Sequence, residues 1–81
     1  MEPSAPTFSV HIDGLSRHDA IRVVRAALGM TRRDVAAAWG VSMSTYDRTE
    51  RGGRTVSAEQ FEWLMLRAER AGVVVARHGD A

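Results

Sequence analysis

The stretch Met30–Gly52, MTRRDVAAAWGVSMSTYDRTERG, contains two short helical signals on either side of a tight turn. Thr31 can cap the first helix, and Asp34 follows three residues later in a capping-box arrangement. Gly40 adopts the left-handed backbone conformation without a Cβ penalty, so it predicts the end of this helix.

A second helix is expected directly after the turn. Ser42 is a good N-cap for it, and we expect Gly52 to close it in the same way that Gly40 closes the first. Two helices joined by a short turn that contains Gly form the helix-turn-helix pattern. In that pattern the second helix enters the major groove of DNA.

The same residues resemble a known family. The pattern Thr-x-x-x-Val-Ala-x-x-x-Gly-Val-Ser-x-Ser-Thr-x-x-x-x-Glu-x-Gly spans Thr31 to Gly52. It is similar to the Xre type of helix-turn-helix, the lambda-repressor-like domain of phage repressors, Cro proteins and many bacterial regulators. With its flanking helices the resemblance covers about residues 17–71. It implies a mainly α fold, a four-helix lambda-repressor-like domain that binds DNA.

The rest of the chain extends this fold at both ends. Residues 1–6 read as a disordered tail, and residues 7–78 as a single helix-turn-helix domain with its core motif at 31–52. Alternating apolar residues predict a short strand at about 7–13, and the β-branched run after Gly72 predicts another at 73–78. These strands could pair within one chain or with a second copy.

Helical spacing also predicts a core. Ser16 caps a helix with Asp19 at its third position, and Ser57 with Gln60 forms a capping box for the last helix, which should stop at Gly72. The inward-facing residues are predicted to be Ile21, Val24, Leu28, Val35, Ala36, Trp39, Val41, Tyr46, Phe61, Leu64, Met65 and Ala68.

Composition narrows the class of protein. At 81 residues without cysteine, the chain is one small domain in which disulfides and thiolate metal sites are excluded. It lacks an apolar run of roughly 18 residues and an N-terminal signal pattern, so we expect a cytoplasmic protein without a membrane partner.

Charge is concentrated on the predicted motif. The net charge is only +1, but residues 17–54 hold eight Arg against four acidic residues, a local net charge of +4. All basic residues are Arg, which suits bidentate contacts with phosphate and guanine. GC-rich coding would produce the same bias.

The resemblance and the exposed positions of the second helix assign DNA contacts. Base contacts are expected from Met43, Ser44, Asp47 and Arg48, and Arg48 is best suited to guanine. Backbone contacts are expected from Arg32, Arg33, Ser42, Thr45, Arg51 and Arg54. Asp47 would repel phosphate unless it accepts from cytosine or orients Arg48. The alternative is that these residues form an ordinary solvated charged face.

The resemblance further implies a structural salt bridge between Arg25 and Glu50, which would tie the first helix to the end of the third. The three histidines, His11, His18 and His78, have no metal-ligand spacing. Ser16, His18 and Asp19 read as a capping segment rather than a nucleophilic triad. We therefore expect no cofactor and no enzymatic activity.

Apolar residues near the C-terminus predict a second surface. Trp63, Leu66, Val73, Val74 and Val75 are expected to form a homodimer interface, unless the terminal strands pair internally and cover Trp63. The resulting hypothesis is a sequence-specific regulator of double-stranded DNA, a phage or prokaryotic repressor that acts as a homodimer on a palindromic operator. Alternatives are a protein-interaction module, such as an antitoxin or phage regulatory factor, and non-specific nucleoid binding.

Overall fold

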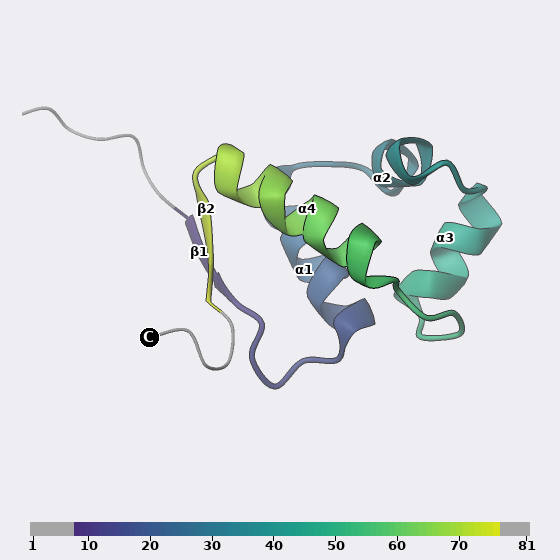
Figure 1. Ribbon diagram of the computed structural model, residues 1–81, viewed down its shortest axis with the longest axis horizontal. Coiled ribbons are helices and arrows are strands. Elements are labelled where there is room, and N and C mark those ends of the chain that lie inside the picture. The colour runs from purple at the N-terminus through teal and green to yellow at the C-terminus, as the bar shows by residue number, and fades with distance from the viewer. Residues whose placement is uncertain (1–7, 77–81) are drawn as a thin grey trace, which may run out of the picture.

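The computed structural model describes residues 8–76. Within that range the elements are, in order, β1 (Phe8–His11), α1 (Arg17–Leu28), α2 (Arg32–Trp39), α3 (Met43–Glu50), α4 (Ala58–Arg70) and β2 (Val73–Ala76) (Figure 1). The prediction of a mainly helical fold with a short strand near each end is confirmed. The predicted tail at 1–6 and the outer ends of the predicted strands, residue 7 and residues 77–78, lie outside the described range.

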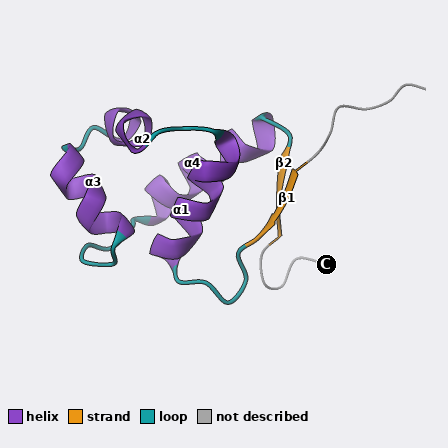
Figure 2. Cartoon of the chain, turned by 180° about the vertical axis from the view of Figure 1, so that it is seen from behind, coloured by secondary structure: helices purple, strands orange, loops and turns teal. Residues whose placement is uncertain are grey.

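The two strands pair with each other inside one chain. They run parallel, with Phe8 opposite Val73 and His11 opposite Ala76. β1 ends at His11 instead of residue 13, because the chain turns after Ile12: the Leu15 amide donates to the Ile12 carbonyl at 3.0 Å. Both views place this strand pair at the opposite end of the molecule from α2 and α3 (Figures 1 and 2).

The turn between α2 and α3 forms as the glycine predicts. Gly40 has a φ of 71°, and its amide donates to the Ala37 carbonyl at 3.2 Å. The next amide, of Val41, donates to the Ala36 carbonyl at 3.0 Å, which completes a Schellman motif. The carbonyls at the end of α2 are thereby satisfied, and the chain is turned into α3.

Two helix ends differ in detail from the prediction. α3 ends at Glu50 with Arg51 as a right-handed cap, and Gly52 takes the left-handed conformation one residue later, at a φ of 87°. At the start of α1, the Ser16 hydroxyl accepts from the Asp19 amide at 3.3 Å. The Asp19 carboxylate binds Arg22 at 2.9 Å, so the reciprocal half of a capping box is replaced by an ion pair.

The core lies where the helices meet. The buried apolar residues are Ile12, Ala20, Ile21, Val24, Val35, Ala36, Tyr46, Val56, Leu64, Met65, Ala68 and Val73. The remaining predicted core residues, Leu28, Trp39, Val41 and Phe61, are half-buried against this cluster. Trp39 packs its ring on Tyr46, with centroids 5.5 Å apart. This contact joins α2 to α3.

Within residues 8–76, each helix is too short or too polar to cross a membrane.

Candidate nucleic-acid interface

A buried polar cluster fixes α3 against α1. Arg25 Nε donates to Glu50 Oε2 at 2.7 Å, and the Tyr46 hydroxyl donates to the same oxygen at 2.6 Å. Arg25 Nη1 also donates to the Met30 carbonyl at 3.0 Å, so one guanidinium holds α3 and the start of the α2 segment together. The side chains of Arg25 and Glu50 are 17% and 8% exposed. The salt bridge that the resemblance implied is therefore present and largely buried.

Arg25 and Tyr46 both remain protonated within this cluster. Burial alone would lower the pKa of Arg25, but the hydrogen bond and charge contact with Glu50 outweigh it, and the pKa is raised above its ordinary value. Burial, and then the hydrogen bond to Glu50, raise the pKa of the Tyr46 hydroxyl. Tyr46 therefore remains a donor to Glu50 throughout the physiological pH range.

This anchoring leaves one face of α3 open. Ser44 and Arg48 are exposed, as is Arg51 directly after the helix. Asp47 retains a side-chain exposure of 33%. The strand pair lies at the other end of the molecule and does not cover this face (Figure 2). The open face thus carries Ser44, Asp47, Arg48 and Arg51, and we call it the α3 face.

Three other residues predicted to contact DNA are engaged in contacts within the protein. Met43 is half-buried and packs against the core. The Ser42 hydroxyl accepts from the Thr45 amide at 3.1 Å and donates to Thr45 Oγ1 at 3.0 Å. These two hydroxyls serve first to begin the helix, so α3 itself carries fewer free polar groups than the predicted set.

The predicted backbone contacts lie at two places beside α3. Arg32 and Arg33 form the first turn of α2, where the helix N-terminus and the side chains are both exposed. Arg54 is exposed on the loop after α3. Arg32 is not free, because its Nη1 lies 3.5 Å from Asp47 Oδ1. The sequence had suggested that Asp47 could orient Arg48. In the structure Asp47 is instead paired with Arg32.

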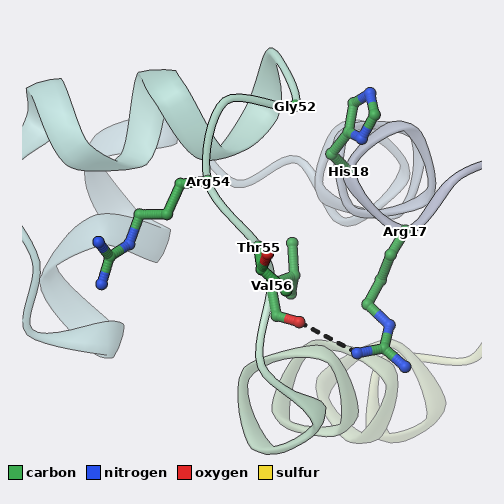
Figure 3. A pocket seen from close by; sticks show the side chains of 6 residues that line it. All are labelled: Arg17, His18, Gly52, Arg54, Thr55 and Val56. Carbon is green, nitrogen blue, oxygen red and sulfur yellow. Dashed lines mark hydrogen bonds between the residues drawn. The ribbon is translucent and has the colours of Figure 1, made fainter.

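A shallow pocket separates the loop after α3 from the start of α1 (Figure 3). Arg17 crosses it and donates to the Val56 carbonyl at 3.0 Å. The Arg54 side chain extends from the opposite side of the loop, so the cations around this pocket do not converge on one point (Figure 3). The His18 ring lies over Gly52, where a Cβ would come within 2.8 Å of it. The absence of a Cβ at Gly52 thus leaves room for the His18 ring.

Ser16, His18 and Asp19 do lie together, but not as a triad. His18 Nε2 is 3.3 Å from Ser16 Oγ and 3.8 Å from Asp19 Oδ1. A catalytic triad uses opposite ring nitrogens for the nucleophile and the acid, whereas here one nitrogen faces both groups. The Ser16 hydroxyl is also occupied as the helix cap. Among residues 8–76, His, Asp and Glu side chains do not gather into a group that could hold a metal ion.

Sequence reasoning missed the Tyr46–Glu50 hydrogen bond and the Arg32–Asp47 ion pair. The first has an i, i+4 spacing on one helix, so it was accessible to a search for facing pairs. The second joins two helices, and its geometry depends on the crossing of α2 and α3. Burial of Thr49 was also missed; its hydroxyl donates to the Thr45 carbonyl at 2.9 Å.

The residues predicted to form a dimer interface do not share one environment. Leu66 and Val74 are 48% and 51% exposed. Trp63 is half-buried, with the Arg67 guanidinium 5.5 Å from its ring centroid. Val75 is also half-buried. Val73 is 5% exposed, because β2 turns it into the chain's own core. Its side chain is therefore turned away from the surface of the single chain.

Comparison with known families agrees with the motif. A family model described as a helix-turn-helix domain matches residues 19–67, which is more than half of the chain. The protein therefore belongs to the helix-turn-helix family, a class whose second helix binds DNA. Neither the curated proteins nor the solved structures include a significant match to it.

Proposed function

We propose that the protein is a sequence-specific transcriptional regulator that binds double-stranded DNA through the α3 face. What supports the proposal is the open surface of α3, with Arg48 exposed on it and the exposed arginines Arg32, Arg33 and Arg54 beside it. Arg48 would read a guanine in the major groove, and the flanking arginines would bind phosphates. Such a protein would work in the cytoplasm of a prokaryotic cell or a phage-infected host.

Selection from randomised duplex DNA, repeated at 50 and 200 mM salt, tests this function. A regulator of the proposed kind enriches one consensus at both salt concentrations, because base contacts persist while phosphate contacts weaken. A non-specific nucleoid protein would bind with a steep salt dependence and enrich no sequence. That result would refute the proposed function.

The regulator is further proposed to act as a homodimer and a repressor. Leu66 and Val74 are large apolar side chains that stay half-exposed. A second copy covering them by two-fold symmetry would present two α3 helices to a palindromic operator, whose half-sites would have to lie about 34 Å, or a multiple of it, apart. A symmetric consensus in the selection supports this arrangement. Sedimentation as a monomer at tens of micromolar, with and without DNA, would contradict it.

The same exposed apolar residues support a second candidate, a protein-interaction module that docks a different protein. Two substitutions separate the candidates. Arg48→Ala should impair a DNA reader, and Leu66→Ser should impair a protein adaptor. The adaptor function is correct if the activity of the protein in the cell survives Arg48→Ala, and if Leu66→Ser abolishes that activity without changing the affinity for DNA.

A further inference from the structure

Asp47 introduces a negative charge into the surface proposed to meet DNA. It lies on the same helical row as Ser44 and Arg51, three residues after the first and four before the second. DNA presents a dense line of phosphates at the edges of the groove. An unpaired carboxylate in this position would oppose binding to every sequence alike, so its environment needs an explanation.

The environment of Asp47 is set by Arg32 from the neighbouring helix. Arg32 is the first residue of α2, and its Nη1 lies 3.5 Å from Asp47 Oδ1. That oxygen is shielded from water and accepts no hydrogen bond from residues 8–76. The contact is therefore a charge pair and not a well-formed hydrogen bond. Arg32 keeps a side-chain exposure of 56%, so much of its guanidinium still faces outward.

We propose that Asp47 is a positioning residue that acts through Arg32 and raises the preference of the protein for its own DNA site. The inference rests on the proposed function. The carboxylate draws the guanidinium toward α3 and offsets its charge. Arg32 can then reach a phosphate with its remaining donors only when α3 itself lies in the groove. On random DNA, where α3 is not seated, the same arginine is held back from phosphates.

The alternative is simple repulsion, in which Asp47 weakens DNA binding without involving Arg32. A double-mutant cycle distinguishes the two, because an effect that passes through Arg32 disappears when Arg32 is removed. The variants are Asp47→Asn, Arg32→Ala and their combination. Glu69→Gln serves as the matched control, since it removes one exposed carboxylate from the last turn of α4.

The measurement is the affinity of each protein for the selected site and for random duplex at 50 and 200 mM salt. Asp47→Asn should strengthen binding to random duplex and add about one phosphate contact. The affinity ratio between the two salt concentrations then grows roughly threefold. Affinity for the selected site should gain less, so selectivity falls. With Arg32→Ala already present, Asp47→Asn should relieve only general repulsion, which changes both affinities by the same factor and adds no phosphate contact. Glu69→Gln should resemble wild type throughout.

Each other outcome has a defined meaning. If Asp47→Asn has the same effect with and without Arg32, or leaves the salt dependence unchanged, the inference is overturned while the proposed function stands. If the wild-type protein prefers no sequence, both are overturned. Thermal unfolding of the variants should stay close to wild type, because the ion pair is partly exposed.

Discussion

The two ends of this molecule are stabilised in different ways. At the α2–α3 end, the ion pair of Arg25 and Glu50 fixes α3 against α1, and the Tyr46 hydroxyl donates to the same carboxylate. The outer surface of this end is polar. At the end formed by α4 and the strand pair, apolar packing dominates, and Leu66 and Val74 remain exposed. A buried charge cluster tolerates little displacement, because its groups lose their partners when the geometry changes. The polar end is thus suited to present a rigid surface, and the apolar end to accept a covering partner.

The largest effect should come from breaking the ion pair that positions α3. Arg25→Ala leaves Glu50 and its 8% exposed side chain without a cationic partner, so we expect a loss of about 3–5 kcal/mol in the free energy of unfolding. Urea denaturation measures it. Arg22→Ala is the control: it removes an ion pair of similar length, 2.9 Å, from the same helix, but with side chains that are 52% and 36% exposed.

We expect that control to cost about 0–1 kcal/mol, because exposed ion pairs are screened by water and salt. Equal losses for Arg25→Ala and Arg22→Ala would show that burial of the cluster contributes nothing to fixing α3.

The next effect concerns the apolar end. Leu66→Ser should weaken self-association, since a leucine that becomes buried in an interface contributes roughly 1.5–3 kcal/mol. Monomer unfolding should change little, because Leu66 is 48% exposed in the single chain. Analytical ultracentrifugation would follow the shift from dimer to monomer. A sedimentation profile identical to that of wild type would exclude Leu66 from any dimer interface.

A somewhat smaller effect is expected on the α3 face. Arg48→Ala should lower DNA affinity by about 1–3 kcal/mol, with the loss confined to sites that carry the preferred base at one position. Arg33→Ala should instead weaken binding to all sequences and reduce the salt dependence by about one phosphate contact. Fluorescence anisotropy with a panel of single-base variants measures both. A uniform loss for Arg48→Ala would place this residue on the phosphate backbone.

The smallest effect is a pH dependence at the start of α2. Hydrogen bonds from the Thr31 backbone and then from its side chain lower the pKa of Asp34 below its ordinary value. The folded state therefore favours the ionised carboxylate. This contribution to stability is full above the pKa of the unfolded chain and is lost as the pH falls through the lower, folded pKa.

Unfolding of wild type and Asp34→Asn should accordingly differ near neutral pH and converge in strong acid. The free energy of unfolding of both proteins as a function of pH tests this. A difference that stays constant with pH would mean that the capping carboxylate acts without its charge.

The sequence predicted the polar end better than the apolar end, for a physical reason. Caps such as Thr31 and Ser42 and the turn at Gly40 depend on neighbouring residues, so local signals suffice to place α2 and α3. The pairing of β1 with β2 joins residues 65 positions apart in register, Phe8 with Val73, and no local pattern determines such a partner. Burial of Val73 follows from that pairing and was consequently missed.

In the candidate site, too, local features could be predicted from the sequence and contacts between separate elements could not. Exposure of Ser44 and Arg48 follows from helical spacing once Tyr46 is assigned to the core. The partner of Asp47 does not, because Arg32 belongs to another helix and reaches it only through the crossing of α2 and α3. Side-chain contacts between elements require the packing of the whole domain.

The most direct test of the proposed DNA contact combines Arg48→Ala with a base analogue. Each guanine of the selected site is replaced in turn by 7-deazaguanine, which lacks the N7 acceptor that an arginine fork uses. At one guanine the two losses in affinity should fail to add, so that the analogue weakens wild type but scarcely affects Arg48→Ala. If the losses add at every guanine, Arg48 does not contact this edge of the bases, and the α3 face does not read DNA in the way proposed.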